Sequence, residues 1–318
     1  MTIVLIILAA LAALVLLGAY LCYYLTFRVP KHPQPETEEY PIPPGKIYEP
    51  HRDLMIQWMK EVRAMPHETF CIRSFDGLQL YGNYYERFPG APIELMVHGY
   101  RGNAERDLCG GVQRAFALGR NALLIDQRCC GSSQGHTITF GVKENRDCRA
   151  WIDFMLQHFG PDVQIVLTGI SMGASTVLIT AGEPLPDNVK IVLADCGFTS
   201  AKAIIHKVIR QLHLPVWPVY PLIRLGARLY GHFDPEAVSA IERVRQTRIP
   251  TIFIHGETDD FVPCAMSKEN YDACAAPKTF MSVPEAGHGL SYVIDGNGYL
   301  KALADFSTQN GLPTTIQK

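Results

Sequence analysis

The residues best suited to chemistry lie in a G-x-S-x-G motif, Gly169-Ile170-Ser171-Met172-Gly173. A serine in this motif can act as a nucleophile when a strand leads into it and a helix follows, because the tight turn exposes its hydroxyl. The segment VQIVLTG before Ser171 is typical of a buried strand, and MGASTVLITAG continues as an apolar helix. Ser171 is therefore the predicted nucleophile.

The chain contains a second match to the same motif, Gly131-Ser132-Ser133-Gln134-Gly135. A strand-like segment, ALLIDQ, precedes it, but the residues that follow are polar and rich in glycine. They predict a loop rather than a helix, so Ser133 lacks the strand–turn–helix context of a nucleophile.

A serine nucleophile needs a base and an acid, which can follow it in the order Ser, Asp, His. His288 lies in the loop PEAGHGLSY and follows all the other elements, so it is the predicted base. Asp259 and Asp260 follow the strand-like segment TIFIH, and Asp195 ends the segment IVLAD. By position alone, the pair after TIFIH is favoured and Asp195 is the alternative. His98 and His255 are interpreted as structural.

The developing oxyanion of an ester or amide transition state needs aimed donors. The backbone amide after the nucleophile, that of Met172, is one candidate. The second donor comes from the loop after an early strand, where ELMVHGYRGN places Tyr100. The sequence therefore predicts an oxyanion hole built from the amides of Tyr100 and Met172.

Short apolar segments alternate with helical patterns along most of the chain, which predicts an α/β fold with a mostly parallel eight-stranded sheet and helices on both faces. The predicted strands are Phe70–Ser74, Leu78–Tyr85, Ile93–His98, Ala122–Gln127, Gln164–Gly169, Lys190–Ala194, Thr251–His255 and Thr279–Val283. The predicted helices are Glu105–Leu118, Lys143–His158, Ala174–Ala181, Pro235–Arg245, Ala265–Ala275 and Ser291–Thr308.

From about Phe70 onward, these motifs resemble the α/β-hydrolase superfamily, and more closely the bacterial membrane-anchored hydrolases related to its Bem46-like and prolyl-oligopeptidase-like branches. The resemblance rests on His98–Asn103, on Asp126–Ser133 with Cys129 at a usual glycine, on Gly169–Gly173, on His255–Pro263 and on Gly287-His288. It implies that Asp259 is the acid and that Ser133 belongs to a structural loop. It does not imply a substrate, because this fold hosts many reactions.

The first 28 residues predict a transmembrane anchor. Thr2 to Phe27 contains no charged residue, and about 20 apolar residues suffice to cross a bilayer as a helix. Tyr20, Tyr23 and Tyr24 lie near its end, where aromatic rings favour the interface. Lys and Arg occur only after the segment, so the positive-inside rule predicts a single-pass membrane protein with a cytoplasmic catalytic domain.

Residues 29–50 contain seven prolines and predict an extended tether between the anchor and a hydrolase domain at 51–318. Residues 199–233 then interrupt the strand–helix alternation. By the resemblance, they form a small helical cap over a hydrophobic acyl or aromatic group; alternatively, they pack on the sheet. Five basic or titratable residues there are candidates to meet anionic lipid head groups: His206, Lys207, Arg210, Arg224 and Arg228.

Composition limits the remaining function classes. The net charge of -2 and the absence of a long basic run argue against a nucleic-acid partner. The nine cysteines show no Cys-x-x-Cys pair, so we predict no metal site and no cofactor.

The sequence thus predicts a serine hydrolase that cleaves esters or thioesters of a small-molecule or lipid-like acyl substrate. The alternatives are a serine peptidase of the prolyl-oligopeptidase-like group and a catalytically silent binding module on the same fold.

Overall fold

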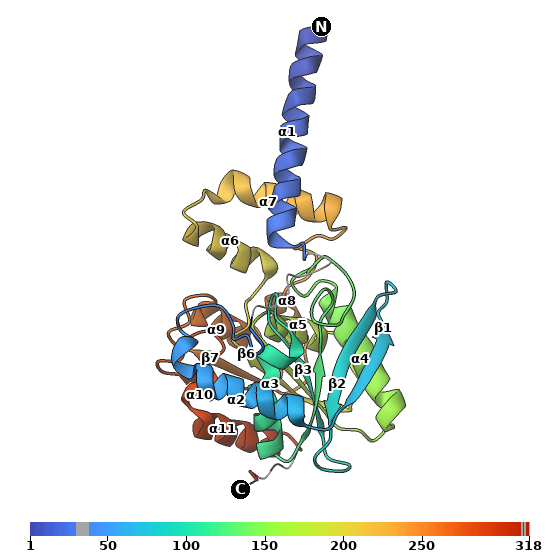
Figure 1. Ribbon diagram of the computed structural model, residues 1–318, viewed down its shortest axis with the longest axis vertical. Coiled ribbons are helices and arrows are strands. Elements are labelled where there is room, and N and C mark those ends of the chain that lie inside the picture. The colour runs from blue at the N-terminus through green and yellow to red at the C-terminus, as the bar shows by residue number, and fades with distance from the viewer. Residues whose placement is uncertain (30–37, 313, 315, 318) are drawn as a thin grey trace.

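The computed structural model describes residues 1–29, 38–312, 314, 316 and 317. Figure 1 shows three tiers: the long helix α1 (Thr2–Thr26), a pair of helices crossing near its end, and an α/β domain beneath them. The N-terminus lies at the free end of α1, and the C-terminus lies at the opposite end of the molecule.

The α/β domain is built on one mixed sheet of eight strands in the order β1-β2-β4-β3-β5-β6-β7-β8. β2 pairs antiparallel with both β1 and β4, and all the other pairs are parallel. The strands are β1 (Glu68–Arg73), β2 (Gln79–Tyr85), β3 (Ile93–Val97), β4 (Asn121–Ile125), β5 (Ile165–Ile170), β6 (Val189–Asp195), β7 (Thr251–Gly256) and β8 (Lys278–Val283). Each predicted strand has its counterpart, and the predicted α/β fold is confirmed.

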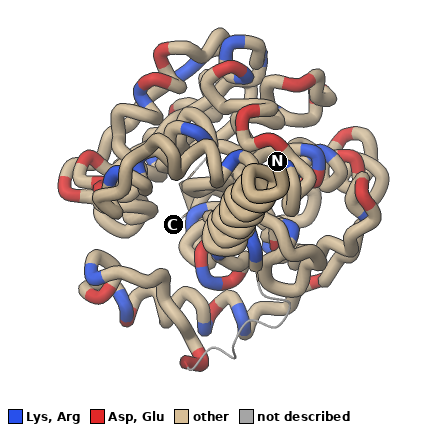
Figure 2. Tube along the Cα trace, turned by 90° about the horizontal axis from the view of Figure 1, so that it is seen from above, with Lys and Arg blue, Asp and Glu red and all other residues tan. Residues whose placement is uncertain are grey.

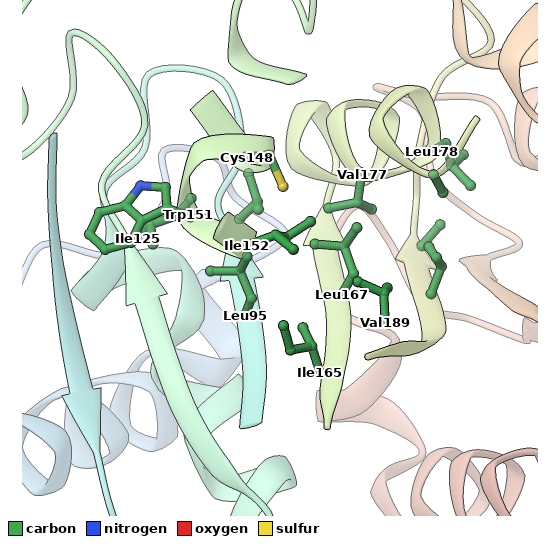
Figure 3. Close-up of a cluster of buried hydrophobic side chains, with 14 of the residues drawn as sticks. Leu95, Ile125, Cys148, Trp151, Ile152, Ile165, Leu167, Val177, Leu178 and Val189 are labelled. Carbon is green, nitrogen blue, oxygen red and sulfur yellow. The ribbon is translucent and has the colours of Figure 1, made fainter. Parts of the chain in front are cut away.

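Burial explains why these segments form strands. Every residue of β3 and of β4 is buried, as expected for central strands covered on both faces, whereas the edge strand β1 alternates between exposed and buried residues. Side chains from the sheet, such as Leu95 and Leu167, pack against Trp151 and Val177 of the covering helices (Figure 3). This core holds the strand ends that carry the site.

The helices agree less completely with the sequence. Those of the α/β domain are α2 (Arg52–Ala64), α3 (Ala104–Ala117), α4 (Glu144–Phe159), α5 (Met172–Ala181), α8 (Ala240–Arg243), α9 (Cys264–Ala273), α10 (Ser291–Ile294) and α11 (Gly296–Gln309), and a 3₁₀ turn at Glu49–His51 precedes α2. The helix predicted at Pro235–Arg245 is shorter, because Ser239 adopts an extended conformation and begins α8.

One further helix prediction needs correction, and one helix was missed. The helix predicted at Ser291–Thr308 is two helices, because Asp295 leaves the helical conformation and its side chain accepts from the amide of Gly298. Helix α2 was not predicted at all, although its buried Met55, Met59 and Val62 follow helical spacing.

Helix α1 is long and apolar enough to cross a membrane. Figure 2, which looks down this helix, shows no charged residue along it. Only Ala19 and Tyr23 are buried within α1, and both lie in its last third, where α7 (Val216–Tyr230) packs across it.

The end of α1 is fixed to the α/β domain. Tyr23 shares a hydrogen bond with the hydroxyl of Thr137 at 2.7 Å, and the amide of Ile138 donates to the carbonyl of Phe27 at 2.9 Å. Tyr23 and Phe27 belong to an apolar cluster that also contains Ile138 and Phe233. The last turns of α1 are therefore part of the packed domain.

The segment predicted as a tether does not stand clear of the domain over its described part. Residues 30–37 lie outside the described residues. Beyond them, the ring of Tyr40 lies 4.4 Å from the guanidinium of Arg63, and Tyr48 is buried beside Met55 and Leu290. The described part of the predicted tether therefore lies against the domain, because its aromatic residues find apolar and cationic partners on α2 and near α10.

Candidate active site

Ser171 occupies a strained turn between β5 and α5. Its backbone has φ 57° and ψ −119°, outside the regions that L-residues prefer. A Cβ on Gly169 would lie 2.2 Å from the carbonyl oxygen of Gly173, and one on Gly173 would lie 2.0 Å from the carbonyl oxygen of Val97. The motif therefore requires both glycines, because the turn folds backbone against backbone.

The structure brings Ser171, His288 and Asp259 into one hydrogen-bonded chain. Nε2 of His288 lies 2.9 Å from Oγ of Ser171, and Nδ1 lies 2.6 Å from Oδ2 of Asp259. The side chain of Asp259 is fully buried, and that of His288 is 12% exposed. This order of hydroxyl, imidazole and carboxylate is the geometry of a serine nucleophile with its base and orienting acid.

The environment of Asp259 favours the carboxylate. Burial alone would raise its pKa, but hydrogen bonds with His255 and His288 and the amide of Val262 hold the pKa well below its usual range. Oδ1 accepts from the amides of Phe261 and Val262 at 2.9 and 2.8 Å. An ionised Asp259 can hold Nδ1 of His288 as the protonated nitrogen and leave Nε2 free to accept a proton.

Asp195, the alternative acid, makes its side-chain hydrogen bonds with residues other than His288. Its carboxylate accepts from the hydroxyl of Tyr299 at 2.8 Å and from that of Ser291 at 3.4 Å, and burial raises its pKa. Its backbone carbonyl accepts from the amide of Ser171 at 2.8 Å. Asp195 therefore stabilises the turn at Ser171 through its backbone carbonyl.

The amide of Met172 begins α5 directly after Ser171, and that of Tyr100 lies in the loop after β3, whose Gly99 lies against Ser171. Within the described part of the chain, neither amide donates a hydrogen bond to another residue. The preceding amide, that of Gly99, donates to the carboxylate of Asp107 at 3.2 Å and fixes the loop. Both predicted oxyanion donors are thus available to a ligand.

The loop that carries Ser133 has a structural role. The Ser133 hydroxyl donates to the carbonyl of Asp126 at 2.6 Å and accepts from the amide of Tyr81 at 2.9 Å. The Asp126 side chain accepts from the amides of Ala104 and Ser132, at 2.9 and 2.8 Å. Ser133 thus ties this loop to β2, away from His288.

The two histidines interpreted as structural are both fully buried. Nε2 of His98 accepts from the amide of Gln127 at 3.0 Å. The ring of His255 bonds the hydroxyl of Ser267 at 2.7 Å and the carbonyl of Val262 at 2.8 Å. They connect the loops around the site but do not reach Ser171.

A cavity of about 650 Å³ opens beside Ser171 and His288. Its apolar wall comes mainly from the N-terminal segment, α2 and α10: Ile47, Tyr48, Met55, Trp58, Tyr292 and Val293. Among the described residues that line it, none comes from 199–233. The predicted cap instead contacts the acid loop, where Gln211 and Lys207 donate to the carbonyl of Asp260.

Sequence reasoning missed the wall formed by the N-terminal segment and α2. Tyr48 donates from its hydroxyl to the backbone carbonyl of His288 at 3.0 Å, so the segment is attached directly to the base. Ile47 lies against Gly287, where an added Cβ would be 3.2 Å from its side chain. The helical spacing of apolar residues in α2 could have predicted that helix. No local pattern in residues 43–48 indicates that they run past the active site.

Three possible metal ligands, Cys196, Asp259 and His288, place donor atoms within 4.8 Å of one another. Burial and the nearby carboxylates of Asp195 and Asp259 raise the pKa of the Cys196 thiol well above its usual value. A neutral thiol is a poor ligand, since metals bind the thiolate. The donor set therefore fits the acid–base pair better than a metal ion.

Comparisons with known proteins agree with this fold. The sequence model of the "alpha/beta hydrolase fold" family matches residues 95–229. YqkD of Bacillus subtilis is 26% identical over 76% of this chain and 79% of its own length, and Bem46 of Schizosaccharomyces pombe is 28% identical over 70% and 69%. The Pyrococcus furiosus esterase Pf2001 superposes with a TM-score of 0.64 at 18% identity, covering 85% of this chain and 96% of that one.

The protein is therefore an α/β-hydrolase-fold protein, as the motifs implied. Its relatives include Bem46, which confirms that part of the resemblance, and these findings support a hydrolase.

Proposed function

We propose that the protein is a serine hydrolase that cleaves carboxylic esters or thioesters of a hydrophobic acyl substrate. The observation that carries the proposal is the chain of hydrogen bonds from Ser171 through His288 to the buried Asp259. A strained, glycine-flanked serine within 2.9 Å of an oriented imidazole is an activated nucleophile.

The first half of the reaction forms an acyl-enzyme. Oγ of Ser171 attacks the carbonyl carbon while its proton passes to Nε2 of His288. The amides of Tyr100 and Met172 receive the oxyanion, and Asp259 stabilises the imidazolium. The bond to the leaving alcohol or thiol then breaks, and the leaving group takes the proton from His288.

The second half regenerates the enzyme. Water gives a proton to Nε2 of His288 and attacks the acyl carbon, and the bond to Oγ of Ser171 breaks. The proton returns to Ser171, and the carboxylic acid leaves. Every proton transfer in this scheme passes through His288.

The cavity supports an apolar substrate group. Its walls contain the side chains of Ile47, Met55, Trp58 and Tyr292, and a volume of about 650 Å³ is in the range of sites for small organic molecules. The nearby Arg101, Arg106 and Arg114 also line it, so its apolar wall is joined to a polar edge. We assign the acyl group to the apolar wall.

We further propose that α1 anchors the chain in a membrane, with the hydrolase domain on the cytoplasmic side. Its 25 residues exceed the roughly 20 that span a bilayer, and its first two thirds are exposed and apolar. Arg28, Lys31 and Lys46 follow the helix, as cytoplasmic flanks do.

A fluorophosphonate probe tests the activated serine. The full chain in detergent should be labelled, and Ser171→Ala should not. Ser133→Ala is the matched control, because it alters the other G-x-S-x-G motif and should keep the label. An unlabelled but folded parent, or equal labelling of Ser171→Ala, would overturn the proposal. A series of p-nitrophenyl esters of increasing chain length then tests the apolar acyl wall.

A further inference from the structure

The segment 201–230 contains an apolar surface that the α/β domain does not cover. We define this surface as Leu212, Leu214, Trp217, Pro218, Pro221 and Leu229. Trp217 is 79% exposed, Leu212 62% and Leu229 44%. A contiguous exposed apolar surface of this kind generally marks an interaction site.

Apolar residues of α7 form one stripe. Pro218, Pro221, Leu225 and Leu229 are spaced by three, four and four residues, which places them on one side of the helix; Leu225 is half-buried, and the other three are exposed. The opposite side holds Tyr220, Ile223 and Ala227, which are buried against α6 (Ala201–Gln211) and its neighbours. Helix α7 therefore has two apolar sides, one covered by the protein and the other open.

Helix α7 packs directly against α1, the predicted membrane-spanning helix. A Cβ on Gly226 would lie 2.1 Å from the carbonyl oxygen of Ala19, and the ring of Tyr230 lies 5.2 Å from that of Tyr20. Helix α7 thus crosses α1 in direct contact, at Gly18 to Tyr23 (Figure 1).

The level of this crossing matches the edge of a bilayer. At about 1.5 Å per residue, the crossing at Gly18 to Tyr23 lies about 24 to 33 Å from the start of α1. The hydrocarbon core of a membrane is about 30 Å thick. The crossing therefore falls where the apolar layer gives way to head groups, the level that Tyr and Trp side chains prefer.

The charges of the segment fit the same surface. Between Ala201 and Phe233 the chain has five Lys and Arg residues and no Asp or Glu. Arg224 and Arg228 both pair with Asp234, and the side chain of Arg228 stays 53% exposed. Arg210 is exposed beside Leu212 and remains suited to a phosphate head group.

We infer that the apolar surface of α6–α7 lies in the interfacial layer of the membrane that α1 crosses. The occupant is the lipid bilayer, because α7 contacts α1 at Gly18 and Tyr20, directly beside the exposed, apolar part of α1. The contact would fix the rotation and tilt of the hydrolase domain on the membrane, which a single helix alone does not do. The inference rests on the proposal that α1 spans the bilayer and not on the hydrolase activity.

Trp217 provides the measurement. The full chain is placed, one copy per disc, in nanodiscs of phosphatidylcholine and phosphatidylglycerol, with and without acyl chains brominated near the head group. The fluorescence of Trp217 is the difference between the parent and Trp217→Phe, since Trp58 and Trp151 are common to both. We expect brominated lipid to quench this difference signal and aqueous iodide to leave it unchanged.

Two variants make the test specific. In the Trp217→Phe background, Leu214→Trp adds a tryptophan on the same surface and should also be quenched by brominated lipid. Ile294→Trp adds one at an exposed position of α10, far from α1, and should be quenched by iodide alone.

Quenching of Trp217 by iodide but not by brominated lipid would overturn the inference. Protection from both quenchers would also overturn it and would indicate that the chain itself covers Trp217. A chain that fails to float with vesicles would show that α1 is no anchor and would remove the basis of the inference. The fluorophosphonate label is unaffected by these outcomes, so the proposed hydrolase chemistry stands or falls separately.

Discussion

The hydroxyl of Tyr100 donates a hydrogen bond to the backbone carbonyl of Thr26 at 2.6 Å. The residue whose amide we propose as an oxyanion donor is thus tied by its side chain to the end of α1. Arg101 adds a second bond, from its guanidinium to the carbonyl of Leu25 at 2.9 Å. The anchor helix and the catalytic loop are therefore one connected structure.

Replacing Tyr100 with Phe should lower kcat while changing KM little. The variant keeps the amide but loses the bond that positions it, so the loss should be smaller than the roughly 10²-fold that removing an oxyanion donor costs. Ester hydrolysis by the full chain measures it. Tyr84→Phe is the control: it removes a hydroxyl bonded to Asn121 at 3.2 Å, away from the site. Equal losses in the two variants would indicate a general effect on stability.

Asp259 and Asp195 should respond differently to the same substitution. Asp259→Asn removes the carboxylate that orients His288, and we expect kcat to fall by roughly 10³- to 10⁴-fold. Asp195→Asn should keep most of the activity, because the carboxylate bonds Tyr299 and Ser291 rather than His288. Steady-state kinetics of both variants decide between the two acids, and a larger loss in Asp195→Asn would reverse the assignment.

The parts of the site that sequence could predict are those fixed by backbone geometry. Ser171 was identifiable because Gly169 and Gly173 leave no space for a Cβ, so a strand–turn–helix of this kind constrains residue types strongly. The central strands were predictable because strands buried on both faces leave continuous apolar segments, and the edge strand β1 because its residues alternate between exposed and buried.

The remaining parts depend on contacts between segments far apart in the chain. Tyr48 reaches His288 across 240 positions, and nothing in the local pattern of residues 43–48 indicates that path. Likewise, the sequence around Gly226 does not indicate that this glycine lies against the backbone of α1. The cavity wall and the covered end of α1 could therefore not be predicted from local spacing.

The stability of the protein should depend on pH through Asp259. Its pKa is lower in the folded state than the value of about 3.9 in an unfolded chain. The carboxylate therefore contributes stability that is present above the unfolded pKa and is lost as the pH falls toward the folded one. The difference in free energy of unfolding between the parent and Asp259→Asn should shrink as the pH falls below about 4.

Asp195→Asn provides a control of opposite sign. Burial raises the pKa of Asp195 in the folded state, so its contribution is present below the unfolded pKa and is lost as the pH rises through the folded one. Relative to this variant, the parent should gain stability as the pH falls. Urea unfolding of the detergent-solubilised full chain at several pH values measures both; parallel pH profiles for the two variants would contradict the assignment.

Gly226→Ala should destabilise the protein, against the usual preference of helices for alanine. In an open helix, the exchange of Gly for Ala stabilises by up to about 1 kcal/mol. Here the new Cβ would lie 2.1 Å from the carbonyl of Ala19, so α1 and α7 must move apart, at a cost of about 1–3 kcal/mol for overpacking. Gly296→Ala is the matched control, because the nearest atom to its Cβ is 3.7 Å away. Thermal unfolding in detergent should show a lower Tm for Gly226→Ala alone, and an unchanged or raised Tm would mean that the two helices do not pack this closely.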